Sequence, residues 1–222
     1  MAQTEQKNQN VKKQFEELQS LLERAMALQT SMVLFEWDDE TLAPKGAAEH
    51  TARVIGSLSE QYQEILASMR FKELLDVCLK AEKENAGVFD EVQSAILREA
   101  AEEQERLSCI PPEEYRAYAE LTACATGIWT RAREKNDFAS FAPVLKEIIS
   151  YQKKFAAYRA KPGQKLYDVM LDTYEKGFNM EMLDPFFELM KGKIVPLLKE
   201  SAERSKMVPD AFLSADYPEA AQ

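Results

Sequence analysis

The chain has 222 residues, of which 45% are hydrophobic and 30% charged, so it has enough apolar material for a packed core and too much for a disordered chain. Its net charge of −10 repels phosphate backbones, and we therefore expect no nucleic acid as a partner. Only 7 glycines are present, and because β-sheets use glycine at their turns, this low number favours long helices with few connections.

The first half of the chain shows the periodicity of four helices. Apolar residues at three- and four-residue steps predict a first helix over residues 11–36, which should end in the acidic run and the Pro44–Gly46 bend that follow it. A second and a shorter third helix follow, and a highly charged fourth helix over 88–107 is expected to have a solvated face. The residues expected to face inwards in the second and third helices are Val54, Leu58, Tyr62, Ile65 and Met69, then Phe71, Leu74, Leu75 and Cys78.

The second half predicts three or four further helices. Pro112 can open the fifth helix at its first turn, and we expect Trp129 to be buried on this helix, flanked by Arg131 and Arg133. A break at 136–137 precedes a sixth helix, and 166–174 is a short helix or a turn. In the last helix Asp184 is the expected cap, Pro185 fits the first turn, and Pro196 should cause a kink. The predicted fold class is all-α, with about seven or eight helices and essentially no strand.

The termini and the cysteines predict a location in the cell. The polar N-terminus lacks the apolar core of a signal peptide, and no apolar run is long enough to cross a membrane. The three cysteines are widely spaced and odd in number, which fits a reducing compartment, and each is best interpreted as a buried small apolar residue. We therefore expect a cytoplasmic protein without a membrane partner.

The single histidine limits the chemistry of the chain. Helical zinc peptidases place two histidines one turn apart as HExxH, and di-iron bundles use Glu-x-x-His pairs. His50 has no second histidine to join it, and Ala47 stands three residues before it. We therefore expect His50 to be a surface residue and expect no metal site and no catalytic residue in this chain. Motifs for nucleophilic or nucleotide chemistry are also absent from the sequence.

An unusual cluster, Glu36–Thr41, places Trp37 beside four acids at the expected end of the first helix. Negative charge is unfavourable at a helix C-terminus, which leaves two interpretations. In the structural one, Asp39 or Thr41 caps the next helix. In the functional one, the acids pair with a basic residue elsewhere or line a groove.

These motifs together resemble those of the carboxypeptidase Taq family, whose members are metal-dependent carboxypeptidases with an all-helical fold. The similarity begins at Trp37–Thr41, continues through Pro44–Gly46 to Arg53, and covers nearly the whole chain. It is carried further by Ile110–Glu113, Trp129–Arg133, Asn136–Leu145, Tyr167–Asp172, Tyr174–Gly177 and Val195–Leu198.

The resemblance implies a full-length enzyme that removes C-terminal residues from peptides, uses a divalent metal (zinc or cobalt) and is usually homodimeric. The family's HExxH ligands lie downstream of the region matched here. Residues 1–206 are then the N-terminal helical portion of such an enzyme, and 207–222 an irregular tail that leads to its catalytic portion. Candidates for the substrate-cleft wall or for buried polar contacts are Trp37, Asp38, Glu40, Thr41, Arg133 and Asp137.

Two hypotheses about the role of the chain stay open at this point. The first is a peptidase fragment that is inactive alone and is expected to form homo-oligomers through apolar residues left uncovered, above all those of the last helix. The second is a stand-alone helical module, derived from such a peptidase and retained for binding or dimerisation.

Overall fold

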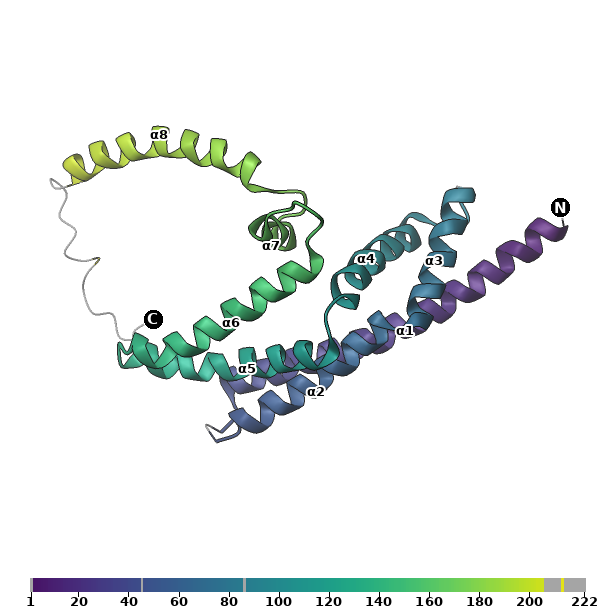
Figure 1. The fold of residues 1–222 in the computed structure, drawn as a ribbon, viewed down its shortest axis with the longest axis horizontal. Helices are drawn as coiled ribbons and strands as arrows, with labels where there is room; N and C mark the ends of the chain where they lie inside the picture. The colour runs from purple at the N-terminus through teal and green to yellow at the C-terminus, as the bar shows by residue number, and fades with distance from the viewer. Residues whose placement is uncertain (1, 45, 86, 206–212, 214–222) are drawn as a thin grey trace. The chain divides into compact units, whose positions relative to one another are not determined.

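The computed structural model describes residues 2–44, 46–85, 87–205 and 213, and over these residues it is helical and contains no strand (Figure 1). The all-α prediction is confirmed. The described helices are α1 (Ala2–Thr41), α2 (Ala48–Ala67), α3 (Met69–Glu84), α4 (Glu91–Ser108), α5 (Pro112–Glu134), α6 (Phe138–Arg159), α7 (Leu166–Tyr174) and α8 (Met180–Ser205). None of these helices combines the length and apolar character needed to span a membrane.

The chain forms two compact units, Met1–Arg159 and Ala160–Gln222. The first unit contains α1 to α6, and the second contains α7 and α8. The irregular tail predicted for 207–222 lies outside the described residues apart from Leu213, so it stays a prediction.

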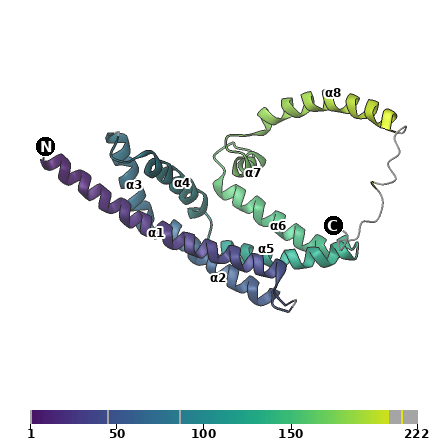
Figure 2. The ribbon, with the colours of Figure 1, turned by 180° about the vertical axis from the view of Figure 1, so that it is seen from behind.

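Three long helices organise the first unit. α2 packs between α1 and α5, and Figures 1 and 2 show the three helices running side by side. The predicted bounds of α1, 11–36, were too short, because the acidic run is itself helical and the helix ends only at Thr41. The backbone N–H groups of Leu42 and Ala43 both donate to the carbonyl of Asp38, at 2.9 and 2.8 Å, and these bonds close the last turn.

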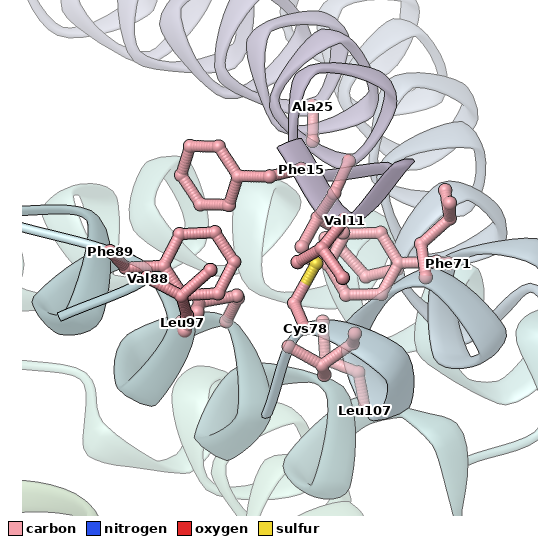
Figure 3. Packing of buried hydrophobic residues seen from close by; sticks show 14 residues of the cluster. Val11, Phe15, Ala25, Phe71, Cys78, Val88, Phe89, Leu97 and Leu107 are labelled. Carbon is pink, nitrogen blue, oxygen red and sulfur yellow. The ribbon is translucent and has the colours of Figure 1, made fainter. Parts of the chain in front are cut away.

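The main core lies where the N-terminal half of α1 meets α3 and α4 (Figure 3). Phe71, Leu74, Leu75 and Cys78 of α3 are at most 2% exposed, so the inward face predicted for this helix is confirmed. The rings of Phe15 and Phe89 lie 5.1 Å apart across the same core. Fully burying such side chains contributes about 1.5–3 kcal/mol each, which makes this core the main source of stability in the first unit.

The buried face of α2 differs from the predicted one. The predicted residues are half-buried, or exposed in the case of Met69, which belongs to α3. The residues that are buried instead are Thr51, Ala52, Ile55, Gly56, Ser59, Gln63 and Leu66. Five of these seven side chains are small or polar, because α2 is enclosed by neighbouring helices that approach it closely.

Gln63 is the fully buried polar residue of this face. Its Nε2 donates to the carbonyls of Leu107 and Ile110, at 3.1 and 2.5 Å. Ile110 follows the end of α4, and the Leu107 carbonyl in the last turn also accepts the N–H of Ile110 at 3.1 Å. Gln63 therefore ties the C-terminal end of α4 to α2. Its Oε1 has no hydrogen-bond partner among the described residues.

α5 and α6 pack through an aromatic cluster of Tyr118, Tyr151 and Phe155, with ring centroids 5.3–5.7 Å apart. The prediction that Trp129 is buried was wrong, since its side chain is 44% exposed. The inward positions of this stretch are taken by the small residues Ala125 and Ala132, which place Trp129 on the outer side of the helix.

The second unit has little core of its own. Among its described residues only Val169 of α7 is buried, and no residue of α8 is. The predicted start of α8 at Asp184 was wrong. The helix begins at Met180, where Asn179 Oδ1 accepts the N–H of Met182 at 3.0 Å, so Pro185 and Pro196 both lie inside it.

Candidate functional site

The acidic end of α1 is open to solvent. Trp37 is 56% exposed, Asp38, Glu40 and Thr41 are exposed, and Asp39 is half-buried. None of the acids forms an ion pair with another described residue. This surface, from Glu36 to Thr41, therefore presents an aromatic ring and unneutralised carboxylates together.

The capping interpretation of this cluster was wrong. The N-cap of α2 is Ala47, which makes no side-chain cap, so neither Asp39 nor Thr41 has that role. Thr41 Oγ1 instead donates back to the carbonyl of Trp37 at 2.6 Å, which ties down the last turn of α1.

Carboxylates from other helices gather near this surface. Cys124 of α5 is half-buried, and its pKa is raised first by burial and then by the nearby carboxylates of Glu49, Glu120 and Asp39. The end of α1, the start of α2 and the middle of α5 therefore meet in an acidic region, in which Arg53 is a counter-charge. Sequence reasoning missed Glu49, Glu120 and Cys124, because no local spacing connects residues from three separate helices.

The other two predicted site residues lie at the corner between α5 and α6. The Arg133 guanidinium stacks over the Trp129 ring, 5.2 Å from its centroid, as expected for a cation–π contact. Asp137 is the N-terminal cap of α6, because its Oδ1 accepts the N–H of Ser140 at 3.2 Å. Hydrogen bonds from the Ser140 side chain and backbone lower the pKa of the Asp137 carboxyl.

The loop between α7 and α8 is fixed by two aspartates four residues apart. Asp172 Oδ1 accepts the N–H of Gly177 at 2.8 Å, and Asp168 Oδ1 accepts the N–H of Met180 at 2.9 Å. Gly177 has a φ of +81°, a conformation that favours glycine. These contacts explain the aspartates and the glycine of the 167–177 motif as structural residues that position the start of α8.

The described residues do not form a site that fits a catalytic metal. His50 is exposed in the first turn of α2. No group of three or more His, Cys, Asp or Glu side chains that could hold a metal ion is found in the part of the chain that the structure describes.

Comparison with known proteins identifies the family. A family model for carboxypeptidase Taq (M32) metallopeptidases matches residues 17–222. The chain belongs to this family. The resemblance noted in the motifs is thereby confirmed, and the match extends through α8.

The relatives are much longer than the chain. Carboxypeptidase 1 of Bacillus subtilis is 32% identical over 91% of the chain, which matches 39% of that protein. Thermostable carboxypeptidase 1 of Pyrococcus furiosus is 30% identical over 83% of the chain and 36% of that protein. The crystal structure of BsuCP superposes with a TM-score of 0.86 at 31% identity, over 94% of the chain and 41% of that structure. The chain thus spans about two fifths of the length of the relatives it matches.

Proposed function

We propose that this chain is the N-terminal helical part of a metal-dependent carboxypeptidase that removes C-terminal residues from peptides. The observation that carries the proposal is the family match over 17–222, combined with coverage of only 36–39% of the curated relatives. The divalent metal of the full-length enzyme, zinc or cobalt, is then held by residues outside this chain.

The helices of this chain would serve such an enzyme as a scaffold and as one wall of the substrate cleft. The exposed Trp37, Asp38, Glu40 and Thr41, with the neighbouring acids on α2 and α5, support a cleft-wall role for the end of α1. Arg133 and Asp137 have local partners at the corner between α5 and α6 that explain them as structural residues. We propose that they stabilise this corner and do not contact the substrate.

Activity measurements test the proposal. We expect the purified chain, incubated with zinc or cobalt and a blocked dipeptide, to show no turnover, whereas Bacillus subtilis carboxypeptidase 1 under the same conditions is the positive control. Metal-dependent turnover that is lost on chelation, and that survives His50→Ala, would contradict the assignment of the metal site to residues outside this chain.

The alternative is a stand-alone module retained for binding or dimerisation. The uncovered apolar residues of α8 are compatible with this alternative as well as with the enzyme part. The gene distinguishes the two proposals. A reading frame that continues beyond codon 222 to an HExxH motif supports the enzyme part, and a stop codon with no such motif downstream supports the module.

We further propose that the protein is cytoplasmic and forms homo-oligomers. Three free cysteines, of which Cys78 is buried, fit a reducing compartment. The exposed apolar residues of α8 provide the driving force for association. Light scattering behind a sizing column should therefore give a mass well above the 25.3 kDa of one chain, and a clean monomer at high protein concentration and moderate salt would contradict self-association.

A further inference from the structure

The buried face of α2 contains a hydrogen-bond acceptor that no described protein group satisfies. Gln63 is 0% exposed, and its Nε2 donates to the carbonyls of Leu107 and Ile110 at 3.1 and 2.5 Å. If the amide were turned over, Oε1 would face these two carbonyl oxygens, which cannot donate, so the two contacts fix the orientation of the amide. Oε1 is therefore a buried acceptor without a partner among the described residues.

A buried acceptor of this kind requires a donor from another source. The large majority of buried polar side-chain atoms in proteins bond to protein or to ordered water, because an unpaired atom loses the hydrogen bond that solvent gives it in the unfolded chain. α1, α4 and α5 all pack against α2, so the first unit itself buries this atom. A ligand of Oε1 must therefore be small enough for an interior site and able to donate a hydrogen bond.

Ser59 provides a second polar group one helical turn from Gln63. It is also buried, at 5% exposure, and residues four positions apart lie on the same helix face with their Cβ atoms about 5–6 Å apart. The Ser59 hydroxyl donates to the thioether sulfur of Met32 on α1 at 3.0 Å, and its oxygen lone pairs can accept. One water molecule that makes two hydrogen bonds of about 2.8 Å joins oxygens up to about 5.6 Å apart, which matches this spacing.

We propose that an internal water molecule binds between Gln63 and Ser59, donating one hydrogen bond to Gln63 Oε1 and the other to Ser59 Oγ. Two protein partners meet the requirement of a buried water for two to four. A cation does not suit the site, because both acceptors are neutral and a buried charge without a counter-charge is far more costly than a buried water. A direct bond from Ser59 Oγ to Gln63 Oε1 is the alternative, and it would give up the contact with Met32.

The water joins three helices of the first unit. Through Ser59 and Met32 it is linked to α1, and through Gln63 it is linked to the C-terminal end of α4. All of these residues lie within 1–159, so the site is independent of the role that the chain has in the proposed enzyme. The water is then a structural component of the fold that holds α1, α2 and α4 together.

A crystal structure of the chain, at a resolution that shows ordered waters, tests the site directly. We expect one water within about 3.2 Å of both Gln63 Oε1 and Ser59 Oγ. A direct contact between these two side-chain oxygens, or an interior without a water at this position, would overturn the proposal.

Relaxation dispersion of the water oxygen nuclei tests the site in solution, because it counts the waters that stay bound longer than the protein takes to tumble. Gln63→Met retains a long unbranched side chain but removes both polar atoms, and we expect it to lose one long-lived water per chain. The matched control is Gln61→Met on the exposed side of the same helix, which should retain the number found in the parent.

Ser59→Ala keeps the test decisive if Gln63→Met does not fold, because it leaves the bonds of Gln63 to α4 in place. It removes one of the two acceptors, so we expect it also to lose one long-lived water per chain. Ser57→Ala, at a half-buried position on the same helix, should retain that water. An unchanged number in Ser59→Ala would show that Oγ holds no water and would refute the bridge.

Discussion

The two units of this molecule both consist of helices, but they differ in how much apolar surface these helices bury. In 1–159, residues from α1, α3 and α4 enclose a continuous apolar cluster. In the described part of 160–222, Val169 alone is buried, although α8 is 26 residues long and rich in large apolar side chains. The difference teaches that the local sequence is enough to specify a helix, whereas a core requires further elements that cover the apolar face.

A pair of phenylalanine substitutions should separate the two units most clearly. Phe71 is fully buried and Phe187 is 51% exposed. We expect Phe71→Ala to lower the free energy of unfolding by about 3–5 kcal/mol through the cavity it creates, and Phe187→Ala to change it by less than about 1 kcal/mol. Urea denaturation at a protein concentration low enough for the chain to be monomeric measures both, and equal losses would show that α8 is packed within a single chain.

A buried charge in the first unit should have the next largest effect. Gln63→Glu replaces a donor to two carbonyls with an acceptor in a fully buried position, which should cost at least about 2 kcal/mol at pH 7. Burial would raise the pKa of this carboxyl in the folded state above its unfolded value of about 4.3. The folded state then retains the proton more strongly than the unfolded state. The loss of stability should therefore be smallest below about pH 4.3 and should grow as the pH rises above it.

The matched control is Gln61→Glu on the exposed side of the same helix, which should stay within about 0.5 kcal/mol. Denaturation curves at pH 4 and pH 7 compare the two variants. A Gln63→Glu protein that is equally stable at both values would contradict the burial of this side chain.

Two glycines should respond in opposite directions to alanine. A Cβ at Gly56 would lie 2.3 Å from Glu120 Cγ, whereas a Cβ at Gly192 of α8 meets nothing within 4 Å. Because Glu120 also pairs with Arg116, we expect Gly56→Ala to cost about 1–2 kcal/mol. Gly192→Ala should raise the stability of α8 by about 0.5–1 kcal/mol. Hydrogen exchange resolves both helices, and a stabilising Gly56→Ala would show that Glu120 moves aside freely.

The smallest expected effect is a difference in thiol reactivity between the two units, which involves no change in the free energy of unfolding at pH 7. Burial raises the pKa of Cys78 from 9.0 to about 11, so the stability linked to this thiol is fully present below pH 9 and is lost as the pH rises through 11. At pH 8 we expect Cys78 to react with an aromatic disulfide reagent far more slowly than an introduced Leu189→Cys on α8. Comparable rates would contradict the contrast between the two units.

The sequence predicted the fold class and α3 well but failed for α2 and Trp129. α3 packs against a single core, so its apolar spacing alone reveals the buried face. α2 is enclosed by several helices, and its buried face includes Thr51, Ser59 and Gln63, which no apolar periodicity marks. Trp129 is exposed because the inward positions near it are held by alanines, a packing choice that single-residue hydrophobicity does not reveal.

The candidate site was less predictable for a different reason. The cluster Trp37–Thr41 stood out because its acids are consecutive, but the nearby Glu49 and Glu120 come from helices that only the fold brings together. Asp137 drew attention through its motif, and its cap to Ser140 became evident only from the geometry. The cleft-wall role of the α1 cluster stays a prediction, as does the proposal that Asp137 and Arg133 stabilise the corner between α5 and α6.

The length of α1 has a mechanical consequence. At 40 residues it is about 60 Å long, and its buried anchors, Val11, Phe15, Leu18 and Ala25, lie well before the acidic end that carries Trp37. The 12 residues from Ala25 to Trp37 span about 18 Å, so a tilt of about 5° at the anchors would move the Trp37 backbone by roughly 1.5 Å. A substitution in the core that reorients α1, such as an enlarged residue at Ala25, would thus be felt as a displacement of the acidic surface, amplified by distance along a rigid rod.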